Sequence, residues 1–338
     1  MGKQSGNNVG VEDEARLGSP PLSVELNAVI VSVDRDMPQV LCIGRDRGRA
    51  GGALPSGPLE STKERTLELA VRSWVREQAG LELGYVEQLY TFGDRYRDSR
   101  EREAGERVIS ISYLALVRQG RLSAGTKAQW RSWYTFFPWE DLRRDRPRVI
   151  DEVVVPRLEE WVASASTKVL RQSRLERAVI NFGLRGGQWD EERVLERYEL
   201  LYELGVIAES SEEVRGREPG ERFGEAMTSD NRRILATAIG RLRGKLKYRP
   251  VVFELLPPSF TLTQLQRLVE ALAGRRLHKQ NFRRLVEKGG LVEGTGSYDA
   301  QTGGRPAERF RFRQAVLRER PAPGLGLPGL RSDGNVRG

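Results

Sequence analysis

The spacing of hydrophobic positions predicts two kinds of element in the first half of the chain. Apolar and β-branched residues dominate positions 24–33 and 39–43, and the turn-like residues 34–36 separate them, which predicts a hairpin. Apolar residues then recur at helical spacing from 61 to 79, where Gly80 ends the pattern. Three further strands and a closing helix are predicted at 86–91, 107–117, 130–139 and 151–162. This order is typical of an α+β or α/β domain with a mixed sheet.

Helices predominate in the second half of the chain. Helical periodicity marks residues 169–182 and 190–204, and a charged, glycine-rich stretch at 209–226 predicts a linker. The clearest boundary is Thr261, which with Gln264 forms a capping box at the start of a helix. Around it we predict helices at 230–246, 261–273 and 278–288, and strands at 251–255, 291–295 and 309–312. Three helices, a short strand and a terminal β-ribbon are the order of a winged helix-turn-helix.

These patterns predict a multidomain protein. An α/β domain with a mixed sheet occupies residues 23–162, a helical connector and linker occupies 163–227, and a C-terminal winged helix occupies 228–316. Residues 1–22 are polar, and 317–338 are rich in proline and glycine, so we expect both segments to be disordered tails.

Composition restricts the class of protein further. The chain has 338 residues, with no apolar run near the roughly 18 residues that a membrane-spanning helix needs, so we expect no membrane partner. Cys42 is the only cysteine and His278 the only histidine, which excludes an intramolecular disulfide and a zinc site built from Cys and His. We expect no metal site. The first residues lack the pattern of a signal peptide, and we expect a cytoplasmic protein.

Charge is distributed unevenly along the chain. The formal net charge is +9, but residues 227–338 carry +13 and residues 1–226 carry −4. Clustered lysine and arginine release counterions from phosphate backbones, so the basic C-terminal part favours a polyanion as partner. A basic surface with no partner is the alternative.

The helix predicted at 278–288 has one apolar and one basic side. Phe282, Leu285 and Val286 share a face at about 100° per residue, and Gln280 and Arg283 point the other way. Arginine pairs with guanine and glutamine with adenine in the major groove, while a wing residue can enter the minor groove or contact phosphate. The candidate contacts to double-stranded DNA are His278, Lys279, Gln280, Asn281, Arg283, Arg284, Lys288 and Arg305. The alternative is a winged helix that contacts another protein and whose basic face is only solvated.

A glycine, a helix and a second glycine in the first domain form a recognisable motif. Its positions are Gly57, Ser73, Trp74, Glu77, Gln78 and Gly80. The segment resembles the Nudix family, whose box reads Arg-Glu-hydrophobic-x-Glu-Glu-x-Gly. Of the three glutamates on that helix only Glu77 is present here, because Trp74 and Gln78 occupy the other two positions.

The missing carboxylates bear on the chemistry that the resemblance implies. Nudix hydrolysis needs several carboxylates on one helix face to hold divalent cations that activate water. The resemblance therefore implies an α/β/α sandwich with a degenerate box, no catalytic residue and no required cofactor. An active Nudix hydrolase that cleaves ADP-ribose or a related nucleoside diphosphate is the alternative.

The order of the two domains carries a more specific resemblance. Residues 260–266, 281–284 and 304–307 are similar to the Nudix-related transcriptional regulators of bacterial NAD metabolism, the NrtR type. This resemblance implies a homodimeric repressor that binds a palindromic operator and senses a nucleotide effector, ADP-ribose or another NAD-related compound. It further implies an effector site whose candidate residues are Tyr90, Phe92, Arg95 and Arg107, with the aromatic rings stacking on the base and the arginines holding the diphosphate. Ordinary core aromatics and surface arginines are the alternative for these four.

Overall fold

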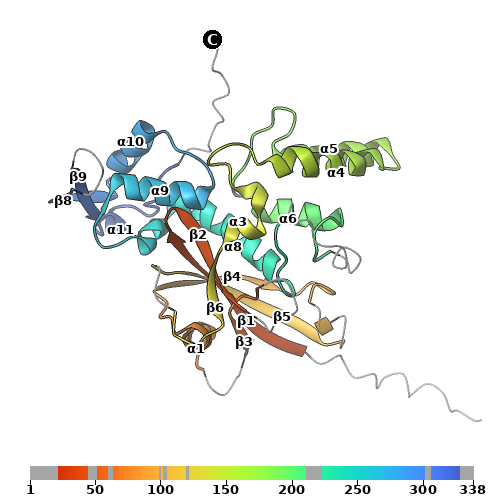
Figure 1. Ribbon diagram of the computed structural model, residues 1–338, viewed down its shortest axis with the longest axis horizontal. Coiled ribbons are helices and arrows are strands. Elements are labelled where there is room, and N and C mark those ends of the chain that lie inside the picture. Colours follow the sequence, from red (N-terminus) through yellow and green to blue (C-terminus); the bar gives the residue numbers. More distant parts are fainter. Residues whose placement is uncertain are drawn as a thin grey trace, which may run out of the picture.

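A six-stranded mixed sheet forms the base of the molecule (Figure 1). The computed structural model describes residues 22–44, 52–59, 64–98, 100–101, 105–118, 122–210, 223–300 and 306–327. Its strands are β1 (Leu22–Asp34), β2 (Met37–Ile43), β3 (Ser56–Pro58), β4 (Tyr85–Phe92), β5 (Arg107–Leu116) and β6 (Ala128–Ser132). They lie in the order β4-β5-β1-β2-β6, and β3 pairs with β1. The central pair β1 and β5 is parallel and the other pairs are antiparallel, as a mixed sheet requires.

The predicted hairpin is confirmed as β1 and β2. Its two turn residues, Arg35 and Asp36, have positive φ angles of 46° and 63°, which two-residue hairpin turns use to match the twist of the strands. Along β1 successive side chains alternate between the two faces of the sheet. Ala28 and Ile30 belong to the core on one face, and Val29 and Val31 to the core on the other.

Helix α1 (Leu67–Ala79) covers the first face. It buries Ala70, Val71 and Val75 against the sheet. We predicted a start near residue 61, but the helix begins six residues later because the side chain of Thr66 accepts a hydrogen bond from the Leu69 amide and caps it. Its end at Gly80, with φ 69°, agrees with the prediction.

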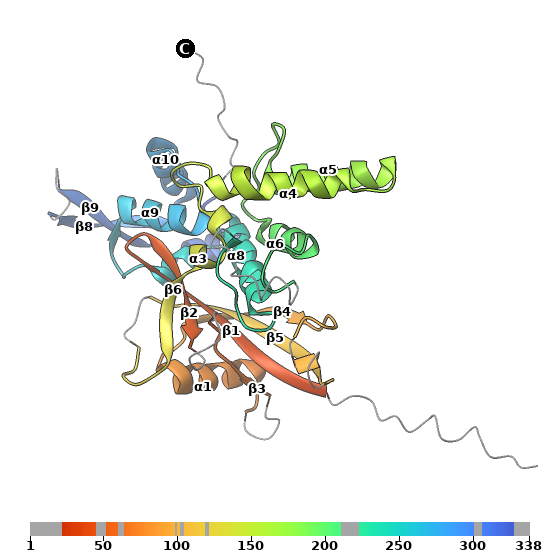
Figure 2. The same ribbon diagram turned by 45° about the vertical axis from the view of Figure 1, so that its right-hand side comes forward.

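The second face is covered by α8 (Asn231–Tyr248), which contacts β1 and β4 (Figure 2). The sheet thus lies between α1 and α8 as an α/β/α sandwich. We assigned residues 230–246 to the winged helix alone, but this helix also closes the sandwich. One continuous core joins Val29 and Leu114 in the sheet to Leu242 in α8 and Phe282 in the C-terminal part.

Residues 130–139, predicted as a strand, change structure halfway. Strand β6 ends at Ser132, whose hydroxyl accepts from the Tyr134 amide and starts the short helix α3 (Trp133–Phe136). The 3-10 helix η2 (Pro138–Glu140) follows. The strand prediction is therefore wrong after residue 132. Further along the chain lie η3 (Ile150–Val154), α4 (Val155–Ala163), α5 (Lys168–Phe182) and α6 (Val194–Glu203), and α4 and α5 project together from the body (Figures 1 and 2).

The C-terminal part has the predicted winged-helix order with one correction. Its elements are η5 (Val251–Leu255), β7 (Phe260–Thr261), α9 (Leu262–Ala273), α10 (Lys279–Gly289), β8 (Val292–Asp299) and β9 (Ala307–Phe312). The segment 251–255 is a 3-10 helix and not the strand that we predicted, and its Val251, Val252 and Leu255 are all buried. The capping box of Thr261 and Gln264 is confirmed by both of its hydrogen bonds. The wing strands β8 and β9 are longer than predicted.

The predicted C-terminal tail is ordered over its first part. Residues 316–319 form α11 (Val316–Glu319), and Leu325 and Leu327 are buried. The amide of Leu325 donates to the carbonyl of Leu246 at 3.1 Å, which ties the segment to the end of α8. Disorder is therefore the wrong prediction for 317–327, whereas residues 1–21 and 328–338 lie outside the described chain. None of the described helices is both long and apolar enough to cross a membrane.

Candidate nucleic-acid interface and effector site

Helix α10 has the two faces that its sequence predicted. Phe282 and Val286 are buried and Leu285 is half-buried, so this side anchors the helix. The exposed side chains are His278, Lys279, Gln280, Asn281, Arg283, Arg284 and Lys288. Within the described chain none of the four cations among them forms an ion pair. The structure thus brings seven of the eight candidate DNA contacts together on one helix and the residue before it.

The wing carries basic residues that the sequence reasoning missed. Arg305, the eighth candidate, lies outside the described residues. Arg309 pairs with Asp299 at 3.1 Å, and Arg311 pairs with Glu293 at 2.7 Å across the β8–β9 ribbon. Alternating acids and bases in the sequence of the wing could have indicated these pairs. They hold the ribbon together.

Residues of the segment that resembles a Nudix box make structural contacts. Gly57 lies against the indole of Trp74, where an added Cβ would overlap the ring. The side-chain amide of Gln78 donates to the carbonyl of Ser56 at 2.6 Å, and its oxygen accepts from the Ser56 amide at 3.3 Å. The box therefore fastens β3 to α1.

Three of the box residues are exposed: Ser73, Glu77 and Gly80. No group of three or more His, Cys, Asp or Glu side chains in the described part of the chain could hold a metal ion. Glu68, on the same helix, pairs with Arg72 at 2.8 Å.

The four candidate effector contacts lie at one end of β4 and β5, but only two of them, Tyr90 and Arg95, are exposed. A β-bulge between Gln88 and Tyr90 leaves Tyr90 56% exposed, whereas Phe92 is 5% exposed. Their rings meet edge to face at 5.1 Å. Arg95 is exposed, but Arg107 pairs with Glu101 at 2.8 Å and also donates to the Gly93 carbonyl. Tyr90 and Arg95 are thus accessible, and Phe92 and Arg107 are already engaged.

A charged cluster beside Phe92 was not predicted from the sequence. The Arg233 guanidinium lies 5.4 Å from the Phe92 ring and pairs with Glu199 at 2.6 Å and with Asp230 at 3.1 Å. Arg97 also pairs with Glu199, at 2.7 Å. Burial raises the pKa of Asp230 to about 6, although Arg97 and Arg233 oppose this shift. These contacts connect the loop after β4 to α6 and to the start of α8.

A second, fully buried cluster joins the sheet side to the winged helix. Glu140 lies between Arg197 of α6, at 2.6 Å, and Arg243 of α8, at 2.5 Å. Arg243 also donates to the carbonyl of Leu272 at the end of α9. The two arginines hold the pKa of Glu140 below its usual value even though burial acts in the opposite direction. Three segments that are distant in the sequence meet at this one carboxylate, and Arg243 connects them to a fourth, α9.

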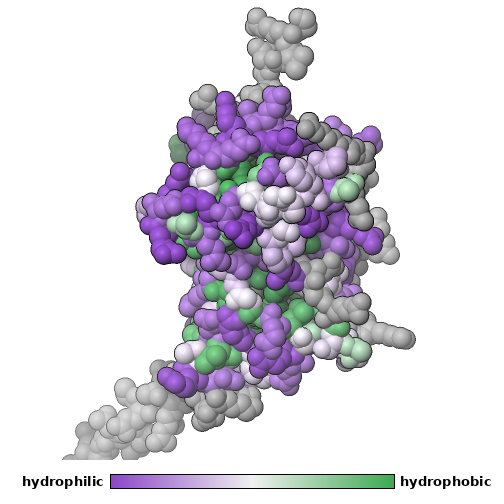
Figure 3. Space-filling view, turned by 90° about the vertical axis from the view of Figure 1, so that its left-hand side faces the viewer, coloured by the Kyte–Doolittle hydropathy of each residue, from purple (hydrophilic) through white to green (hydrophobic). Residues whose placement is uncertain are grey.

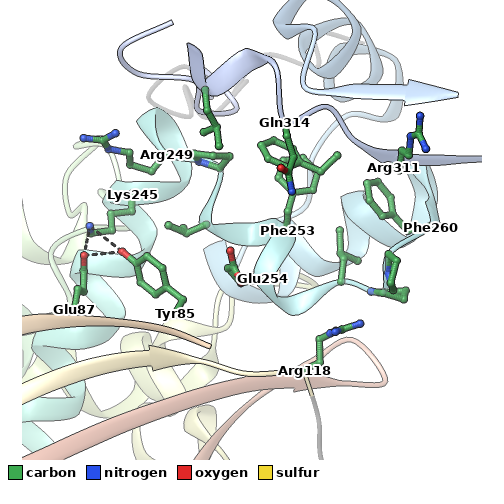
Figure 4. A pocket seen from close by; sticks show the side chains of 17 residues that line it. Tyr85, Glu87, Arg118, Lys245, Arg249, Phe253, Glu254, Phe260, Arg311 and Gln314 are labelled. Carbon is green, nitrogen blue, oxygen red and sulfur yellow. Dashed lines mark hydrogen bonds and ion pairs between the residues drawn. The ribbon is translucent and has the colours of Figure 1, made fainter. Parts of the chain in front are cut away.

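A cavity opens between the sheet and the winged helix. Its volume is about 710 Å³, and its walls come from β4, the end of α8, η5 and the end of β9 (Figure 4). Figure 3 faces this side of the molecule and shows apolar surface between the sheet and the winged helix. None of the sequence-predicted site residues lines it.

Comparison with known proteins identifies relatives of the C-terminal part and of the fold. Residues 252–312 match the family described as the NrtR DNA-binding winged helix domain. The ADPR responsive transcriptional repressor NtrR of Acinetobacter baylyi is 40% identical over 83 residues, which cover 25% of this chain and 33% of that protein. This match thus spans about one third of the length of the curated relative.

Solved structures extend the likeness to the whole fold. NrtR of Shewanella oneidensis complexed with a 27mer DNA has a TM-score of 0.52 at 19% identity, covering 87% of this chain and 95% of that chain. A second crystal structure of Shewanella oneidensis NrtR has a TM-score of 0.52 at 19% identity, covering 86% of this chain and 94% of that chain. These matches confirm the predicted fold class, a mixed-sheet α+β part followed by a winged helix.

Proposed function

We propose that this chain, an NrtR-type Nudix-related protein with an NrtR winged helix domain at residues 252–312, is a ligand-responsive transcriptional repressor. The observation that carries the proposal is the exposed face of α10, on which Lys279, Arg283 and Arg284 have no ion-pair partner in the described chain. Two relatives support it, since one is named a transcriptional repressor and the other was crystallised with DNA.

The geometry of α10 fits the major groove of DNA. Its buried side, centred on Phe282, leaves the opposite side free along the whole helix. Arg283 and Gln280 can read guanine and adenine edges, and Lys279 and Lys288 can neutralise phosphates. In a two-fold dimer, two such helices would meet half-sites about 34 Å apart, so we expect a homodimer on a palindromic operator.

The effector in this proposal is a nucleotide, ADP-ribose or another NAD-related compound. The Acinetobacter relative is described as ADPR responsive, and the target genes that we propose are those of NAD metabolism. Tyr90 and Arg95 are exposed and can contact such a ligand directly, whereas Phe92 and Arg107 must first exchange their present partners. A ligand that prefers the arrangement unable to bind DNA lowers operator affinity, and DNA lowers ligand affinity by the same factor.

We further propose that the protein is not a hydrolase and requires no cofactor. Glu77 is the one glutamate of the box that remains, and Trp74 and Gln78 are committed to packing and to hydrogen bonds with β3. Incubation with ADP-ribose and Mg²⁺ should release no AMP above the rate of a Glu77→Gln variant. Glu77-dependent release of AMP would instead support an active Nudix hydrolase.

The direct test is binding to promoter DNA of NAD-biosynthesis genes at moderate salt. We expect a sequence-selective complex that weakens as salt rises, because phosphate contacts release counterions. Replacing both Arg283 and Arg284 with Ala should lower operator affinity about tenfold or more while ADP-ribose binding is retained. Arg171→Ala, an exposed arginine on α5, is the matched control and should bind DNA like the wild type. Equal binding by the double variant would point to a protein partner for the winged helix.

A further inference from the structure

The cavity between the sheet and the winged helix has an aromatic wall. Phe253 of η5 stacks on Phe312 of β9 at 4.4 Å with an interplanar angle of 27°, and the Phe260 ring lies 5.7 Å from Phe253. All three line the cavity, together with Tyr85 from the edge strand β4 (Figure 4). The volume of about 710 Å³ falls within the range of pockets that bind small molecules. A flat aromatic ring is the shape that such a wall accommodates.

The polar groups of the cavity divide into paired and unpaired ones. Lys245 pairs with Glu87, and the Tyr85 hydroxyl donates to Glu87 at 2.6 Å, so these three polar groups are already paired with one another. Arg311 at the opposite side is held by Glu293. These groups shape the cavity but have little capacity left for a ligand.

The unpaired groups are two arginines and one carboxylate. Arg118 and Arg249 are exposed at its edge, and Glu254 lies on η5 between Tyr85 and Arg118 in Figure 4. None of the three has a hydrogen-bonded or ionic side-chain partner among the described residues. A cavity with two free cations and a free acceptor beside an aromatic wall matches a ligand that combines an anion, a ring and an N–H donor.

We propose that this cavity is a binding site for a nucleotide. In the complex, the base lies against the aromatic wall, an exocyclic amino group of the base donates to Glu254, and Arg118, which lies at the same end of the cavity as Phe260 in Figure 4, holds the phosphate. The site is separate from Tyr90 and Phe92, since the cavity lies at the start of β4 and those residues lie at its end.

The position of the cavity gives the binding a consequence. One wall belongs to the sheet and the end of α8, and the other belongs to η5 and the wing strand β9. A bound nucleotide would contact both parts and fix the winged helix relative to the sheet. Its effect on operator affinity rests on the proposed function, whereas the binding itself does not.

Titration calorimetry with AMP on the full-length protein tests the site. We expect AMP to bind more tightly than adenosine, which lacks the phosphate, and than ribose 5-phosphate, which lacks the base. Replacing Arg118 with Ala should lower AMP affinity about tenfold or more, to the level of adenosine. Arg249→Ala, at the opposite end of the cavity in Figure 4, is the matched control, with unchanged affinity. Both arginines are exposed, so each variant should keep the wild-type unfolding temperature.

A second variant tests the role of Glu254. Glu254→Gln replaces an acceptor by a group that can also donate, so AMP affinity should fall while affinity for IMP, which has a carbonyl in place of the amino group, should rise. A reversal of the AMP to IMP preference in this variant would place the base beside Glu254.

Three results would overturn the inference: no AMP binding at millimolar concentration, unchanged AMP affinity in Arg118→Ala, or an unchanged AMP to IMP preference in Glu254→Gln. Operator binding measured on the same samples separates this failure from failure of the proposed function. If the protein binds the operator normally but fails the AMP tests, the proposed function stands and the nucleotide site in the cavity is disproved.

Discussion

Trp74 and Gln78 make packing and hydrogen-bond contacts that hold α1 against β3. Both occupy positions at which the Nudix box that the sequence resembles has carboxylates, and both contact β3, Trp74 through Gly57 and Gln78 through Ser56. The replacement of two box carboxylates can be read from the sequence alone, because the positions are counted from Gly80. The sequence could not predict these contacts, since nothing local relates residue 56 to residue 78.

The contact between Gly57 and Trp74 predicts a destabilised variant. Gly57→Ala adds a Cβ that overlaps the indole, so we expect the free energy of unfolding to fall by about 1–3 kcal/mol. Urea denaturation measures the change. Gly84→Ala is the matched control, because a Cβ at Gly84 meets nothing within 4 Å, and a loss equal to that of Gly57→Ala would contradict the explanation.

The helix boundaries that the sequence analysis assigned from a capping signal were predicted well, whereas two short segments marked only by apolar residues were not. The start of α9 follows from Thr261 and Gln264, and the ends of α1 and α9 follow from Gly80 and Gly274. The runs 130–139 and 251–255 were wrong because short apolar segments do not distinguish a strand from a buried helical turn. In both segments burial by neighbouring elements decides the structure.

Contacts between side chains on different elements could also not be predicted from the sequence. Asp230 at the start of α8 meets Arg97 and Arg233, and Glu199 of α6 completes the cluster. These residues are spread over more than one hundred positions, and their charges resemble those of any solvated surface. The same holds for Arg243, whose burial contradicts the usual place of a charged residue.

The raised pKa of Asp230, at the start of α8, predicts how the free energy of unfolding depends on pH. Burial raises the pKa of Asp230 from 3.8 to about 6, so between these values the folded state binds more protons than the unfolded state. Its contribution to stability is therefore present at low pH and is lost as pH rises through about 6. Relative to Asp230→Asn, the wild type should lose up to about 3 kcal/mol between pH 4 and 7, measured by denaturation at each pH. Parallel pH profiles would show that another group titrates.

At the scale of the whole molecule, the buried cluster around Glu140 fixes how the parts are assembled. Its carboxylate receives Arg197 and Arg243, and Arg243 reaches the end of α9. Sheet side, connector and winged helix therefore share one charged centre inside a common hydrophobic core. The connector that the sequence marked only as helical has a structural role here.

Removing the charge of Glu140 should destabilise the entire fold. Glu140→Gln leaves two buried guanidinium groups without a counter-charge, and we expect a loss of about 3–5 kcal/mol in unfolding free energy. Thermal and urea unfolding should show one transition at reduced stability. Glu160→Gln, which breaks an exposed pair with Arg157, is the control and should cost less than about 1 kcal/mol. A similar small loss at Glu140 would show that the cluster is not important for stability.

Helix α8 sets a limit on how this protein can be dissected. A fragment that stops before residue 231 would expose Leu114 and Leu116 of the sheet to water, and the complementary fragment would begin with an amphipathic helix that lacks α6 and the sheet, against which it packs. Each half expressed alone should be prone to aggregation. Separate crystallisation or screening of the two halves therefore requires a copy of α8 in both.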